Sequence, residues 1–101
     1  MENGASQAND EALREKAREA VQLGRVPGRR PDRVLGGVGR QRTCVVCNQM
    51  ITLSQMEIEA EFHRNGIASE STCYWFHPRC FSAWEADRQA LEAPAGSDRR
   101  L

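Results

Sequence analysis

Two short stretches decide the fold of this chain: CVVCNQMI at residues 44–51 and FHPRCFSAW at residues 76–84. Each holds two metal-ligating side chains separated by two residues: Cys44 and Cys47 in the first, His77 and Cys80 in the second. A C-x-x-C turn can aim both sulfurs at one point, and residues three apart share a face in the first turn of a helix. The spacing predicts one tetrahedral structural zinc ion held by all four side chains.

Cys73 is an alternative fourth ligand because it lies four residues before His77. The H-x-x-C pair closes a tighter chelate than Cys73 would close with Cys80, so His77 is favoured. The other interpretation of Cys44 and Cys47 is a redox dithiol, which needs a helix directly after the first cysteine inside a βαβ unit. The following NQMITLSQ has no helical pattern, and this favours the metal.

The length of 101 residues predicts one small domain with tails. The core of a domain this small rarely contributes more than about 3–5 kcal/mol of stability, so such domains usually need a metal or disulfides as well. Structural zinc contributes on the order of 10–16 kcal/mol. The polar, acidic start MENGASQANDE is unlike a secretory signal, which indicates a cytoplasmic protein whose four cysteines are metal ligands or thiols, not disulfides.

Periodicity predicts an α+β organisation. Residues 1–8 are expected to be disordered, 9–24 to form an amphipathic helix with an apolar stripe, and 25–41 to form a basic linker. A zinc-binding domain is predicted for 42–92, and a disordered tail for 93–101, beginning just before Pro94. Within the domain, alternation over 56–63 indicates a half-buried strand whose acidic face is solvated. A turn at 64–66, a loop, a short strand at 73–76 and a helix from Pro78 follow.

The linker carries the positive charge of a chain whose 14 basic and 14 acidic residues otherwise balance. Its RVPGRRPDRVLGGVGRQR pattern combines prolines and glycines with basic side chains. These candidate nucleic-acid contacts are Arg25, Arg29, Arg30, Arg33, Arg40 and Arg42. Basic runs in flexible chain bind phosphates readily, although an ordinary soluble tether has the same composition.

The two pairs, their hairpin-length separation and the segment WFHPRCFSAW together resemble a treble-clef zinc finger. LIM-type fingers share the C-x-x-C and an aromatic-His-x-x-Cys-Phe segment, and poly(ADP-ribose) polymerase fingers are similar in having Phe and Trp after H-x-x-C. The linker followed by GGVG resembles that of small bacterial proteins. The resemblance covers residues 44–84 and implies a knuckle (the turn that carries Cys44 and Cys47), a β-hairpin and a helix around zinc on Cys44, Cys47, His77 and Cys80.

A closed four-ligand site leaves no open coordination position, and the sequence shows no nucleophile–base pair, deaminase signature or phosphate loop. We therefore expect a non-catalytic interaction module that binds another protein. The alternative is a DNA- or RNA-binding protein that uses the basic linker beside the finger. The sequence specifies neither the identity of the partner nor the oligomeric state.

Overall fold

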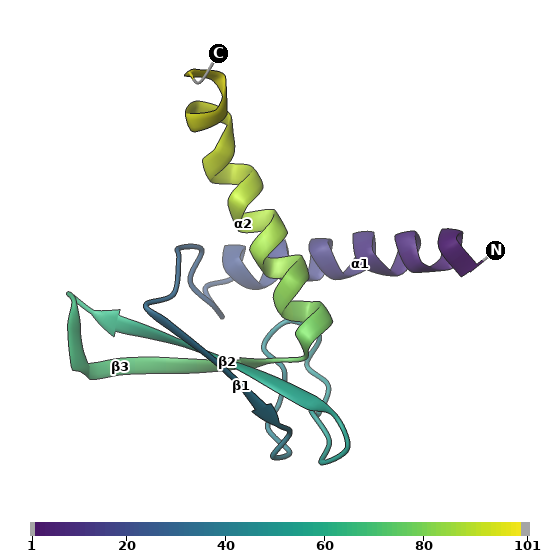
Figure 1. The fold of residues 1–101 in the computed structure, drawn as a ribbon, viewed down its shortest axis with the longest axis horizontal. Helices are drawn as coiled ribbons and strands as arrows, with labels where there is room; N and C mark the ends of the chain where they lie inside the picture. The colour runs from purple at the N-terminus through teal and green to yellow at the C-terminus, as the bar shows by residue number, and fades with distance from the viewer. Residues whose placement is uncertain (1, 100–101) are drawn as a thin grey trace.

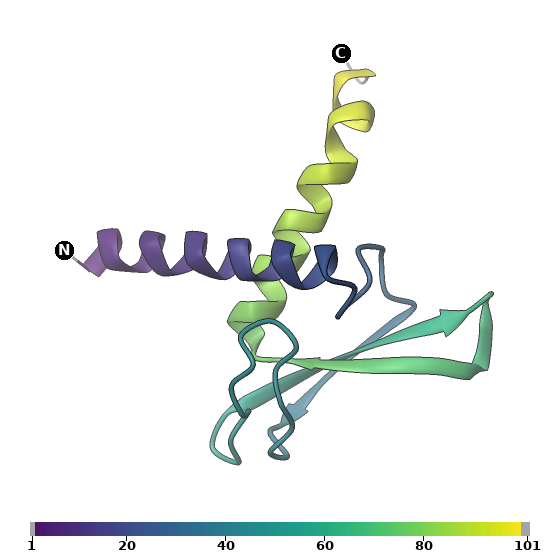
Figure 2. The same ribbon diagram turned by 180° about the vertical axis from the view of Figure 1, so that it is seen from behind.

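A computed structural model describes the backbone of residues 2–99 and the side chains of residues 10–90. Its elements are α1 (Glu2–Gln22), β1 (Arg33–Val38), β2 (Met56–Arg64), β3 (Ile67–Phe76) and α2 (Pro78–Arg99). The three strands form an antiparallel sheet in the order β1-β2-β3, and the two helices cross each other on one side of it (Figures 1 and 2). The predicted α+β class is confirmed.

Helix α1 packs on α2 through the predicted apolar stripe, in which Ala17 and Ala20 are fully buried. Gly24 ends this region with φ +77°, where its N–H bonds to the Val21 carbonyl and the next N–H bonds to the Ala20 carbonyl. This is the Schellman arrangement that a glycine after a helix predicts. The helix starts at Glu2, within the segment predicted to be disordered; residues 2–8 contain no proline, although Gly4 is a poor helix former. Met1 lies outside the described residues.

Strand β1 corrects the prediction of a linker over 25–41. It pairs along its length with β2, from Arg33 opposite Glu61 to Val38 opposite Met56. Composition alone could not show this, because the pairing partner is a distant acidic strand. Gly39 continues the ladder by donating its N–H to the Gln55 carbonyl at 2.7 Å.

A tight hairpin joins β2 to β3. Asn65 and Gly66 both have positive φ, at 54° and 77°, as a type I′ turn requires. The predicted turn is therefore confirmed. The predicted loop after it is wrong, because β3 begins at Ile67 and runs to Phe76.

The two faces of β2 differ, as the alternation predicts. Phe62 is buried and meets the Trp84 ring of α2 edge to face, at 6.1 Å between centroids. The prediction of a solvated acidic face is wrong: Glu57 is only 3% exposed and pairs with Arg40 at 3.1 Å. Arg40 also lies 3.7 Å from Glu59. This arginine, from the segment predicted to be a linker, therefore covers the acidic face.

Helix α2 extends to Arg99 and thus past Pro94, where the disordered tail was predicted. A proline inside a helix removes one backbone donor, so local propensity does not favour this continuation. Residues 100 and 101 of the predicted tail lie outside the described residues. Of the helices in the described part of the chain, neither is long and apolar enough to cross a membrane.

Candidate metal centre

The first cysteine pair lies on a turn that closes on itself. The Cys44 N–H donates to the Gln49 carbonyl, and the Asn48 N–H donates to the Cys44 carbonyl, both at 2.9 Å. Asn48 takes a left-handed φ of 64°, which asparagine tolerates better than most residues. A bridge between Thr43 and Met50 closes the base of the turn. The backbone therefore curls around the two sulfurs.

The second pair lies where β3 passes into α2. Phe76 is the last residue of the strand, and Pro78 is the first residue of the helix, a position that its fixed φ suits. Cys80 follows in the first turn. The Val45 N–H donates to the Trp75 carbonyl at 2.9 Å, so the cysteine turn is tied directly to the end of β3.

The structure brings the four predicted ligands together. The ligand atoms of Cys44, Cys47, His77 and Cys80 all lie within 4.8 Å of one another. A tetrahedral ion with bonds near 2.3 Å separates its ligands by about 3.8 Å, so the group could hold one metal ion after a small contraction. The His77 Nδ1 lies 3.4 Å from the Cys47 sulfur and 3.9 Å from the Cys80 sulfur, so this nitrogen faces the centre.

The other nitrogen of His77 has its own partner. The Nε2 lies 3.3 Å from the Met50 carbonyl, which can only accept a hydrogen bond. This contact places the proton on Nε2 and leaves the Nδ1 lone pair free for a metal. Such support for the far nitrogen is usual for metal-bound histidines. This contact could not be predicted from the sequence, because every residue has a backbone carbonyl group.

The surroundings of the sulfurs favour a thiolate at Cys44. A hydrogen bond from the Cys80 thiol lowers the pKa of Cys44, and the N–H groups of Cys47 and other nearby residues add to the effect against burial. The pKa of Cys80 is raised, first by this same hydrogen bond to Cys44 and then by burial. Burial likewise raises the pKa of Cys47. Without a cation the three sulfurs therefore compete for protons, and a divalent ion would relieve that competition.

Cys73 lies apart from this cluster, on the face of the sheet that carries Glu59 and Glu61. It pairs in register with Glu61, beside the row that contains Glu59. Burial, a hydrogen bond to Glu59 and the negative charges of both carboxylates together raise the pKa of the Cys73 thiol to about 11. The group of described residues that could hold a metal contains His77, not Cys73.

We expect Cys73 to be the one thiol open to alkylation in the metal-loaded protein. At pH 8 iodoacetamide should label it more slowly than free cysteine, because a thiol with a raised pKa is mostly protonated. Its labelling rate should rise with pH between about 9 and 11, the ordinary and the raised pKa. Mass spectrometry of timed samples measures this rate.

Glu59→Gln is the matched variant for this measurement, because removing a negative charge should lower the pKa of Cys73 and speed its labelling at pH 8. Cys73→Ala should remove the label. Labelling of a second thiol as fast as Cys73 would show that at least one of the other three cysteines is not held by a metal.

The basic residues of the predicted nucleic-acid surface are dispersed over the fold. Most make contacts within the chain. Arg40 pairs with Glu57 and Glu59, Arg33 lies 3.9 Å from Glu61, Arg29 bonds to the His63 carbonyl and Asp32, and Arg42 stacks over the Trp75 ring at 4.3 Å. Arg25 is partly buried and Arg30 is exposed.

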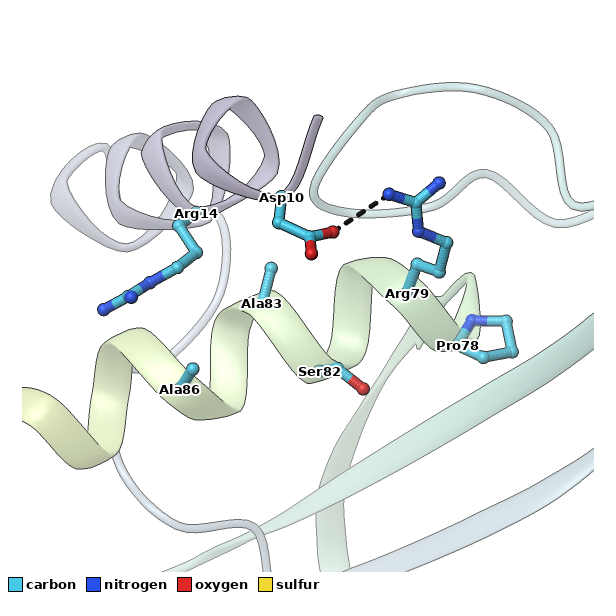
Figure 3. Close-up of a pocket in the computed structure, with 7 residues that line it drawn as sticks. All are labelled: Asp10, Arg14, Pro78, Arg79, Ser82, Ala83 and Ala86. Carbon is cyan, nitrogen blue, oxygen red and sulfur yellow. Dashed lines mark hydrogen bonds and ion pairs between the residues drawn. The ribbon is translucent and has the colours of Figure 1, made fainter. Parts of the chain in front are cut away.

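Arg42 and Arg79 flank the two ligand pairs in sequence, but their guanidinium groups have other partners. Arg42 lies over Trp75, and Arg79 in the first turn of α2 bonds to Asp10 of α1 at 2.9 Å (Figure 3). The latter contact links the start of α2, and so the second ligand pair, to α1.

No protein-family model, no curated protein and no solved structure matches this chain. The geometry therefore defines the class by itself: an α+β protein with a three-stranded antiparallel sheet and a Cys3His group that could hold a metal ion.

Proposed function

We propose that this chain is a small non-catalytic interaction module, folded as a treble clef around one structural zinc ion, that binds another protein. The observation that carries the proposal is the convergence of Cys44, Cys47, His77 and Cys80. The order of elements supports the treble clef, because a knuckle, the β2–β3 hairpin and the start of α2 surround the cluster in that sequence.

The donor set supports zinc. Three thiolates and one imidazole suit a borderline-soft cation of tetrahedral preference, and Cys3His is a common set for structural zinc. With all four positions taken by protein groups, the ion would have no place for a substrate or an activated water. Its contribution would then be to hold the knuckle against α2.

The surface beside the cluster supports a protein partner. The base of the cysteine turn and the loop after it expose Met50 (52%) and Leu53 (63%), and Met56 at the start of β2 is 55% exposed. A groove of about 400 Å³ adjoins this loop, lined by Met56 and Leu13 together with His77 and Cys80. Apolar side chains that gather beside a rigid site are typical of protein-binding surfaces.

Nucleic-acid binding is the second candidate, and the contacts of the basic residues reduce its support. Arg29, Arg33 and Arg40 already neutralise carboxylates of the chain itself. A phosphate would have to compete with these ion pairs, so fewer of the linker arginines are free to contact a backbone than the sequence suggests.

The test is capture of partners from lysate on immobilised, metal-loaded protein. We expect one or more proteins to be retained by the parent chain and lost from the double variant Met50→Ser/Leu53→Ser. Leu23→Ser is the matched control, because Leu23 is equally exposed at 64% but lies at the end of α1. Retention that is unchanged by the double variant would contradict a partner site on this loop.

Nucleic-acid binding, the second candidate function, is tested with the same metal-loaded protein. Binding to labelled DNA and RNA is measured as salt is raised, with Arg25/Arg29/Arg30/Arg33→Ala as the comparison. We expect at most weak binding with a shallow salt dependence. A steep salt dependence that this variant abolishes would favour nucleic acid over the protein partner.

A further inference from the structure

Strand β1 is an edge strand that lacks the usual protection after its first residue, Arg33. In the described part of the chain only β2 pairs with it. Residues 34–39, VLGGVG, carry no charge, and Val34, Leu35 and Val38 are 43%, 44% and 63% exposed. Natural edge strands usually carry a charge, a proline or a bulge that discourages further pairing. An uncharged, exposed edge is therefore available to another strand.

The hydrogen bonds to β2 show which groups of β1 point outward. Gly39 donates to Gln55, and the register sets Gly37 opposite Glu57 and Leu35 opposite Glu59. In an antiparallel pair alternate residues bond to the same neighbour, so these odd positions face β2. The N–H and C=O groups of the intervening positions face the open edge. These positions are 34, 36 and 38.

We propose that the open edge of β1 pairs antiparallel with β1 of a second copy of this chain, with Gly36 opposite Gly36. A two-fold axis through this pair would join two three-stranded sheets into one continuous sheet. Residues 34 and 38 would then be opposite each other, and each has its N–H and C=O directed at the other copy.

This register is complementary on both faces. On one face Val34 would meet Val38 of the second copy, an apolar pair of the kind that stabilises neighbouring strands. On the other face Leu35 would lie over Gly37 of the second copy, where an added Cβ would have no described atom within 4 Å. Each exposed apolar side chain of β1 thus gains an apolar or glycine neighbour.

Charge at the two ends favours a second copy as the occupant. The same register brings Asp32 of one copy toward Arg40 of the other. Both groups have partners within their own chain, because Arg40 pairs with Glu57 and Glu59, and Asp32 pairs with Arg29 and accepts the His63 N–H. Their side chains are still 60% and 34% exposed, so the contact between copies would add to these pairs and not replace them. The β1 segment is complementary to itself in this register. An unrelated strand would need its own matching apolar and charged residues at the same positions.

The test is the association of the metal-loaded protein, measured by sedimentation equilibrium from micromolar to near-millimolar concentration. We expect the mass to rise from one chain to two. Val34→Lys/Val38→Lys sets lysine against lysine at both symmetric pairs and should weaken association by roughly tenfold or more. Val34→Glu/Val38→Lys sets glutamate against lysine at the same pairs and should restore it.

Leu23→Lys, an equally exposed site outside β1, is the control and should associate like the parent chain. Metal content and far-ultraviolet circular dichroism establish that each variant is folded. A mass of one chain at every concentration would overturn the proposal, as would a Glu/Lys variant as dissociated as the Lys/Lys variant. Neither result would alter the metal content of the parent, so failure here is distinct from failure of the zinc site.

Discussion

Stripping the metal from the purified chain should abolish its cooperative unfolding transition. The largest fully buried side chains are few, and Cys44 is itself one of them beside Trp84, Phe76, Ile51, Val26 and Val46. A core of this size supports only about 3–5 kcal/mol, whereas zinc binding to small modules is worth on the order of 10–16 kcal/mol. The free energy of zinc binding would therefore exceed the stability that the apolar core supplies without the ion.

The apo chain has a second difficulty. Cys44, Cys47 and Cys80 converge with His77 within 4.8 Å, and the Cys44 thiolate favoured there raises the pKa of Cys80. Without a cation this cluster offers one negative charge and competing protons in a mostly buried site. We expect the knuckle to open first, which releases Val45 from Trp75 and with it the end of β3.

Cysteine offers a matched pair of variants for this experiment. Cys47→Ser removes a ligand and should leave the chain unfolded at ordinary zinc concentrations, while Cys73→Ser changes the same atom outside the cluster and should leave metal content and stability nearly unchanged. Metal analysis and thermal unfolding by circular dichroism measure both. A chain that still unfolds cooperatively after exhaustive chelation would show that the apolar core suffices without the ion.

Acid should act like the chelator. The ligands bind metal as thiolates and neutral imidazole, so protons compete with the ion and stability falls as the pH is lowered. This is the opposite of the effect of Cys73, whose raised pKa removes stability as the pH rises from about 9 to about 11.

Local chemistry predicted the parts of the fold that depend on a few adjacent residues. The ligand spacing located the cluster, Gly24 located the end of the first helix, and Asn65-Gly66 located the hairpin turn. Each of these features is a backbone conformation or a chelating pair that a few adjacent residues determine. The convergence of the four candidate ligands needed only one further condition, namely that the hairpin between the two pairs brings the chain back to the first pair.

Strand β1 and the covered acidic face were missed for one shared reason. Composition marks 25–41 as a linker, and Glu57, Glu59 and Glu61 as a solvated face, only while each is considered alone. Together they are complementary, because Arg33 and Arg40 pair with these carboxylates across the β1–β2 ladder. Pairing between segments so far apart depends on tertiary structure. The periodicity of one segment does not predict which other segment it pairs with.

Gly39 shows how close that tertiary approach is, and Gly39→Ala should be among the most damaging single substitutions outside the cluster. A Cβ at this position would lie 2.1 Å from the Thr52 carbonyl oxygen and 3.1 Å from the Ile51 Cγ2. The carbonyl is backbone, so the loop that follows the knuckle would have to move away. The cost of such overpacking is about 3 kcal/mol.

Gly37→Ala is the matched control because it adds the same methyl group to the same strand, with no described atom within 4 Å of it. It should leave stability unchanged or raise it slightly, since alanine restricts the unfolded chain more than glycine does. Denaturant unfolding at one fixed zinc concentration compares the two variants. Because Ile51 donates its N–H to the Arg42 carbonyl at the base of the knuckle, Gly39→Ala should also weaken metal binding, which Gly37→Ala should not. Equal stability of the two variants would mean that β1 does not pack against the knuckle loop, and the glycines would then be no more than the linker that their composition suggests.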